Sequence, residues 1–167
     1  MAVQAIAGVS ASSEAVVMIE YPSISAGGIG QLLGSIYESV PSPFGLPKLS
    51  YVFALATAPF GILLYALQKA FGQRYVLTNR EVQIWTSRTQ VKVGSVNLAD
   101  IDSVELEQQP GQVFFNAADI RMKGANGETL FRLSGVKDAG AFKSTIERTA
   151  EARRMVKDSM QRIEARG

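Results

Sequence analysis

Apolar and polar positions divide this chain into parts with different periodicities. Residues 49–71, LSYVFALATAPFGILLYALQKAF, are almost continuously apolar, and no charged residue lies between Lys48 and Lys69. The run reaches the roughly 20 residues that a helix needs to cross a hydrocarbon core, so it predicts a transmembrane helix. Pro59 and Gly61 lie in its middle and keep a re-entrant hairpin open as the alternative to a single pass.

Small residues recur along one side of this apolar segment. They lie at near-helical spacing, a pattern that lets a second helix approach closely. We therefore predict helix packing in the membrane through Ser50, Ala54, Ala58 and Gly61.

The segment before the apolar run has the pattern of a short amphipathic helix. Apolar residues recur at helical spacing from Ile29 to Val40, and polar residues such as Gln31 and Glu38 lie opposite them. Such a helix lies on a membrane surface or against a partner, or it packs on the protein's own domain, and the pattern leaves both open. A short strand is predicted ahead of it, over residues 14–19.

After Gly72 the period changes to the alternation of short strands. A helix capped by Asp138 follows, with Phe142, Ile146 and Ala150 on its inward face. The pattern predicts an α+β domain in which antiparallel strands are closed by a C-terminal helix. The predicted strands cover residues 74–78, 82–87, 91–96, 104–108, 113–115, 118–123 and 128–134, with turns at Asn79-Arg80, Pro110-Gly111 and Asn126-Gly127.

Charge is distributed unevenly along the chain. Residues 1–68 hold one Lys and three Glu, a net charge of −2, whereas residues 69–167 hold sixteen Lys and Arg against twelve Asp and Glu, a net charge of +4. Positive residues that follow the apolar run favour a cytoplasmic C-terminal domain, and the imbalance is too small to suggest nucleic acid. The residues expected to contact anionic lipid or a partner are Arg74, Arg80, Arg88, Lys92, Arg153, Arg154 and Lys157.

The chain has no cysteine and no histidine, which removes the usual zinc ligands and nucleophile–base pairs. The close carboxylate pairs, Asp100 with Asp102 and Glu105 with Glu107, have a spacing that solvent-facing charge also produces. We interpret Trp85 and the Phe114-Phe115 pair as packing residues. No catalytic residue, cofactor or metal site is therefore predicted.

Several stretches resemble the bacterial PH-like domain family of small membrane proteins. The most specific is RYVLTNR, residues 74–80, which resembles the family's first hairpin. The other similar stretches are EYPS at 20–23, the link at 96–105, the strand at 127–133 and the helix at 136–146. The resemblance implies a PH-like antiparallel barrel or sandwich plugged by a helix, with no shared enzymatic activity; such domains generally bind lipid or protein. Many relatives carry two adjacent spanning segments, whereas here the first is replaced by the amphipathic stretch at 29–40.

These observations predict four segments: an N-terminal part with the amphipathic helix (1–48), a transmembrane helix (49–71), a PH-like domain (72–150) and a charged helical extension (151–167). The expected function is that of a non-enzymatic, membrane-anchored accessory subunit on the cytoplasmic side of a bacterial inner membrane. It would dock on and stabilise a larger membrane protein complex, of which a photosynthetic reaction centre is one example. Recognition of anionic membrane lipid by the domain is the alternative.

Overall fold

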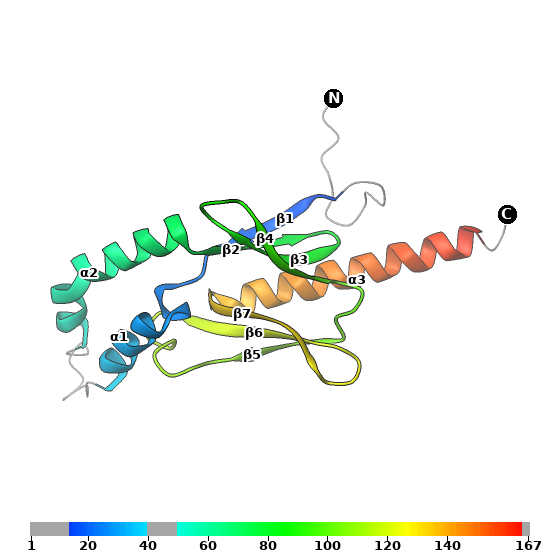
Figure 1. Cartoon of the computed structure of the whole chain (residues 1–167). Coiled ribbons are helices and arrows are strands. Elements are labelled where there is room, and N and C mark those ends of the chain that lie inside the picture. The colour runs from blue at the N-terminus through cyan, green and yellow to red at the C-terminus, as the bar shows by residue number, and fades with distance from the viewer. Residues whose placement is uncertain (1–13, 40–49, 165–167) are drawn as a thin grey trace, which may run out of the picture.

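Seven strands, three α-helices and one short 3-10 helix form the described part of the chain, residues 14–39 and 50–164, in the computed structural model (Figure 1). The first half contains β1 (Val16–Glu20), the 3-10 helix η1 (Ile24–Ala26), α1 (Gly28–Ser39), α2 (Ser50–Phe71), β2 (Gln73–Thr78) and β3 (Glu81–Thr86). The second half contains β4 (Lys92–Asn97), β5 (Ser103–Glu107), β6 (Ala117–Lys123), β7 (Thr129–Lys137) and α3 (Ala139–Glu164).

The strands form two antiparallel sheets, one with the order β1-β2-β3-β4 and one with the order β5-β6-β7. The predicted α+β class is confirmed, but neither sheet closes into the expected barrel. The reason lies at the junction between the sheets: β4 ends its sheet by pairing with β3, whereas β5 pairs with β6. The domain therefore has two open sheets that share one core.

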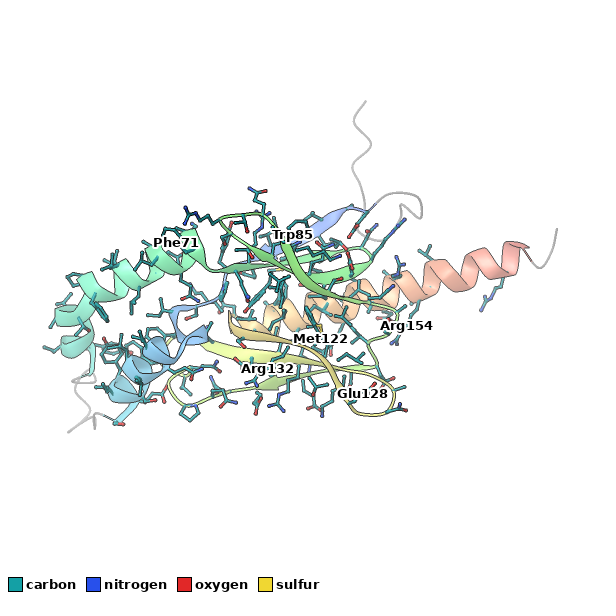
Figure 2. All side chains as sticks on the ribbon, viewed as in Figure 1. Phe71, Trp85, Met122, Glu128, Arg132 and Arg154 are labelled. Carbon is teal, nitrogen blue, oxygen red and sulfur yellow. The ribbon has the colours of Figure 1, made fainter. Side chains whose placement is uncertain are left out.

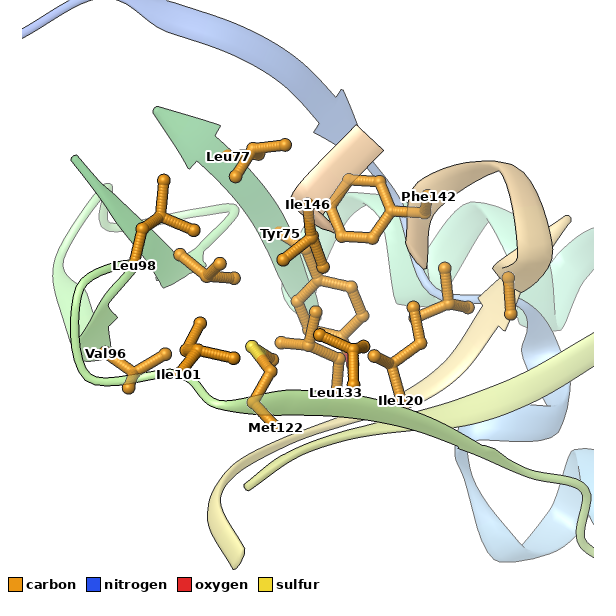
Figure 3. Packing of buried hydrophobic residues seen from close by; sticks show 14 of the residues in the cluster. Tyr75, Leu77, Val96, Leu98, Ile101, Ile120, Met122, Leu133, Phe142 and Ile146 are labelled. Atoms are coloured by element: carbon orange, nitrogen blue, oxygen red, sulfur yellow. The ribbon is translucent and has the colours of Figure 1, made fainter. Parts of the chain in front are cut away.

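Helix α3 fills the space between the sheets. Phe142 and Ile146 are fully buried and Ala150 is nearly so, which confirms the predicted inward face of this helix. They pack with apolar residues from both sheets in one cluster (Figure 3). The partners that Figure 3 labels include Tyr75, Leu77, Val96, Leu98, Ile120, Met122 and Leu133.

Two predicted hairpins are confirmed, and each is stabilised locally. Thr78 Oγ1 accepts hydrogen bonds from the backbone N–H groups of Arg80 (3.1 Å) and Glu81 (3.0 Å), which fixes the turn between β2 and β3. In the turn between β6 and β7, Gly127 has φ +75°, a conformation that glycine adopts without strain. Residues 113–115, predicted as a strand, instead belong to a series of turns that follows β5.

The apolar segment forms the 22-residue helix α2, which contains Pro59. Across residues 14–39 and 50–164, no helix combines the length and the apolar character that crossing a membrane requires. The transmembrane helix predicted over residues 49–71 is therefore not found. Instead, α2 turns polar groups toward the domain: Thr57 bonds to the Tyr37 hydroxyl, and the Gln68 amide donates to the Ser23 carbonyl (2.9 Å).

Tyr75 joins the two sheets at their shared core. Its ring is 2% exposed on β2, and its hydroxyl donates to the Ser134 carbonyl on β7 (2.8 Å) and accepts from the Ser134 N–H (3.1 Å). Burial of the hydroxyl raises the pKa of Tyr75 to about 12, because a buried phenolate would lose its hydration, and the nearby Asp119 carboxylate adds to the rise.

This environment predicts a loss of stability in alkali that depends on one hydroxyl. The unfolded chain releases the Tyr75 proton near pH 10 and the folded chain only near pH 12, so the free energy of unfolding falls between these values, by roughly 2–3 kcal/mol. Urea unfolding at several pH values should show this fall in the wild type and not in Tyr75→Phe. Tyr65→Phe, which removes a hydroxyl from a tyrosine that is 47% exposed on α2, is the control. An equal fall in wild type and Tyr75→Phe would contradict the assignment.

Candidate functional site

A buried carboxylate organises one end of the three-stranded sheet. Asp119 on β6 is 1% exposed, and its oxygens accept hydrogen bonds from the Gln112 side chain (2.6 Å), the Gly135 N–H (2.8 Å) and Arg132 Nε (2.9 Å). The hydrogen bond to Asp119 raises the pKa of the Arg132 guanidinium. The charge of Asp119 is thus buried with its hydrogen-bonding capacity used, as a stable buried carboxylate requires.

Gln112 links Asp119 to the turns at residues 110–116 by hydrogen bonds. Its side chain is fully buried, and its Oε1 accepts from the Gln109 N–H (2.8 Å). Its backbone carbonyl accepts from the N–H groups of Phe115 (3.2 Å) and Ala117 (3.0 Å). These turns therefore form a compact support between β5 and β6, which we call the 110–116 turn.

Helix α1 lies on the 110–116 turn. The Glu38 carboxylate accepts from the backbone N–H groups of Gly111 and Phe114, both at 3.0 Å. Gly34 approaches the backbone of Gly111 so closely that a Cβ on Gly34 would lie 2.0 Å from the Gly111 carbonyl oxygen. Tyr37 completes the contact, with its ring centroid 4.6 Å from that of Phe114.

The amphipathic helix predicted before the apolar segment is confirmed as a helix, but its aliphatic residues point away from the domain. Glycines, Tyr37 and Glu38 make the contact with the 110–116 turn. Ile29, Leu32 and Ile36 remain between 56% and 68% exposed. One side of the helix packs on the domain, as one of the two interpretations predicts. The side with Ile29, Leu32 and Ile36 is uncovered, and its contact with a membrane or a partner stays a prediction. Val40 lies outside the described residues.

Two of the small residues predicted to form a packing stripe on α2 lie beside a groove. Ala58 and Gly61 line a groove on the domain side of the helix, next to Thr57. The side chains of Ser50 and Ala54 lie outside the described part. The two described residues of the predicted stripe thus border the groove, on the side where Thr57 bonds to Tyr37 of α1 and Gln68 bonds to Ser23. Packing of the stripe against another helix in the membrane stays a prediction. Large apolar side chains, such as Leu55, are exposed on α2 instead.

The groove between α1, α2 and the domain has a volume of about 690 Å³. Its walls are Leu33 and Tyr37 from α1, the domain side of α2, and Phe114 and Phe115 from the 110–116 turn. Three charged residues also line it: Glu20 at the end of β1, Lys137 at the end of β7, and Asp138 just before α3. The groove is therefore aromatic in its lining and carries both signs of charge.

The predicted basic contacts separate into two groups. Two of them lie near the C-terminal end of α2. The Arg74 guanidinium is 5.9 Å from the centroid of the Trp85 ring, and the Arg88 guanidinium is 5.3 Å from the centroid of the Phe71 ring. Figure 2 labels both aromatic residues. Arg88 is exposed there, whereas Arg74 is half-buried and its Nε is buried. Lys69 lies over the rings of Tyr21 and Tyr65 in the same region.

Three of the other predicted basic residues bond within the protein. Lys92 pairs with Glu81 at 2.5 Å. Arg153 donates to the Asn79 carbonyl (3.2 Å), and Arg154, labelled in Figure 2, donates to the Ile101 carbonyl (2.6 Å). Arg80 lies in the turn between β2 and β3, and the side chain of Lys157 is outside the described part.

The carboxylate pairs that could have suggested acid–base chemistry face cross-strand cations. Glu105 pairs with Lys123 at 2.7 Å, and Glu107 pairs with Arg121. Asp100 and Asp102 are exposed where the chain passes from β4 to β5. Among the described residues, no group of acidic side chains is arranged to hold a metal ion.

A comparison with protein-family models matches residues 24–150 to the family described as "Bacterial PH domain". The match covers α1, α2, strands β2 to β7 and the part of α3 that packs in the core. No curated protein and no solved structure matches the chain.

The contact between α1 and the 110–116 turn predicts a sharp difference between two glycines of one helix. Gly34→Ala should destabilise the protein by roughly 1–3 kcal/mol, because its methyl group would meet the Gly111 backbone. Gly28→Ala is the control, since nothing lies within 4 Å of an added Cβ there. Chemical unfolding measures the difference, and hydrogen exchange should show that α1 is less protected in Gly34→Ala alone. Equal stability of the two variants would contradict the close contact.

Proposed function

This chain belongs to the bacterial PH domain family, and we propose that it is a non-enzymatic accessory subunit that docks on a larger membrane protein complex. The observation that carries this proposal is an exposed apolar surface on two adjacent helices. We call it the outer apolar face; it consists of Ile29, Leu32 and Ile36 of α1 and Leu55, Ile62 and Leu63 of α2.

The outer apolar face is unusual for a surface in contact with water. Each of its six side chains is between 54% and 76% exposed, and α1 and α2 contact each other. Large exposed apolar side chains on two helices in contact mark a site of association with protein or membrane, because their burial releases ordered water. The other side of both helices faces the domain and the groove, so a protein partner would approach from outside.

Basic and aromatic residues at the C-terminal end of α2 support an orientation for this docking. Lys69, Arg74 and Arg88 lie there beside tyrosine, tryptophan and phenylalanine rings. Aromatic and basic side chains favour the boundary between apolar and aqueous regions of a membrane. The proposal therefore has the outer apolar face against the membrane assembly and the two sheets in the cytoplasm of a bacterial cell, at the inner membrane.

A photosynthetic reaction centre remains one candidate host. A subunit without histidine would brace such an assembly rather than hold its pigments.

Recognition of anionic lipid is a second candidate function. One observation favours it: Arg74 and Arg88 make cation–π contacts and no ion pair with any carboxylate in the described residues. Their charges are thus available to phosphate groups at a membrane surface.

Purification of the protein from its own membranes in a non-ionic detergent tests the first proposal. The wild type should migrate with a stoichiometric companion complex, and the double variant Leu32→Glu, Leu55→Glu should lose at least about tenfold of that association, since it places charge in an apolar contact. The double variant Val91→Glu, Val93→Glu, at two positions that are each 57% exposed on another element, is the matched control and should remain associated.

Different results separate the two functions. A wild type that migrates alone, yet binds anionic vesicles in a manner weakened by Arg74→Gln and Arg88→Gln, would overturn the docking proposal in favour of lipid recognition. Equal losses in the two double variants would also contradict docking through the outer apolar face.

A further inference from the structure

We propose that the groove between α1 and α2 binds a single-chain zwitterionic amphiphile, with its hydrocarbon chain against the aromatic lining and its head group at Glu20, Lys137 and Asp138. This site lies between the helices and the domain, and it borders the outer apolar face, with which it shares Ile62. It does not depend on the accessory-subunit proposal, because it concerns a small ligand held within one chain.

The groove has the size and lining of a ligand site. Its volume of about 690 Å³ lies within the range of pockets that hold small molecules. The aromatic residues Tyr37, Phe114 and Phe115 are among those that line it. The Tyr37 hydroxyl is bonded to Thr57, so the tyrosine presents its ring rather than an unsatisfied polar group.

Space inside the groove is open where α2 crosses it. A Cβ added to Gly61 would meet no atom within 4 Å, although Gly61 is one of the lining residues. Ile62, the next residue, also lines the groove and is 68% exposed. The groove is therefore continuous with the outer apolar face, which gives a hydrocarbon chain an apolar route of entry.

The charges that line the groove specify the head group. Lys137 makes no ion pair within the described residues, and it lies in the lining with two carboxylates. Glu20 accepts a hydrogen bond from the Tyr21 N–H (3.2 Å) and Asp138 accepts one from the Asn116 amide (2.5 Å), so each is held in place. A purely anionic head would be attracted by Lys137 and repelled by both carboxylates.

A head that carries an anionic phosphate and a cationic ammonium avoids this conflict. The phosphate can pair with Lys137, and the ammonium can pair with Glu20 or Asp138, so both signs of charge meet their complement. A hydrocarbon chain then continues into the aromatic groove. A lysophospholipid with an ethanolamine head has this chemistry.

Calorimetric titration of the full chain with palmitoyl lysophosphatidylethanolamine, below its micelle concentration, tests the site. We expect saturable 1:1 binding that Gly61→Leu weakens at least about tenfold, because the leucine side chain would occupy the groove. Gly61→Ala controls for the gain in helix propensity, and Ala66→Leu places a leucine at an exposed position of α2; both should bind like the wild type. Binding that Gly61→Leu leaves unchanged would place the ligand elsewhere and overturn the proposal.

The head-group assignment is tested with surface variants that leave the core intact. Lys137→Met should weaken binding at least about fivefold, whereas Lys143→Met, at a lysine of α3 paired with Glu147, should not. Asp138→Asn should weaken binding of the ethanolamine lipid and not of palmitoyl lysophosphatidylglycerol, which lacks the ammonium. Equal affinity of the wild type for these two lipids would overturn the zwitterionic assignment, and no binding of either would overturn the site.

Discussion

The arrangement of the helices depends on the burial of one carboxylate. Asp119 loses its hydration inside the domain, and donors from Gln112 in the 110–116 turn and from Arg132 and Gly135 on β7 compensate for that loss. One donor, Gln112, shapes the 110–116 turn that receives α1. Another donor is the N–H of Gly135. The carbonyl of Gly135 accepts a hydrogen bond from the Ser23 N–H, and the Ser23 carbonyl accepts one from the Gln68 side chain of α2. Both helices are thus placed relative to the sheets through contacts that begin at Asp119.

The sequence predicted those parts of the fold that local interactions determine. The hairpin at Asn79-Arg80, the turn at Asn126-Gly127 and the buried side of α3 all depend on residues within a few positions of one another. The barrel did not follow, because closure depends on which strand edges pair across the molecule. Residues 113–115 were assigned wrongly for a similar reason: their apolar character fits a strand, but Glu38, more than 70 positions away, binds the backbone of Phe114 in a turn.

The candidate site was only partly predictable. The small residues of α2 and the apolar residues of α1 were recognised, but their directions were not. A stripe of small residues shows that something approaches closely, and it does not show whether the neighbour is another chain or the same one. Gly34 beside Gly111 is the clearest example, because a contact between two glycine backbones leaves no hydrophobic signal. Asp119 and Gln112 were missed, since an isolated acidic residue in a strand has the pattern of a surface position until its partners are placed around it.

The pairing of β1 with β2 has a consequence for how the chain folds. Val16 lies opposite Thr78, and residues 21–72, with both helices, lie between the two strands in the sequence. The meander β2-β3-β4 closes over short turns and can form early, whereas β1 can join it only after a long loop has been ordered, at a greater cost in chain entropy. During synthesis β1 leaves the ribosome well before its partner strand exists. The segment that completes the larger sheet is therefore the first to be made and among the last to find its place.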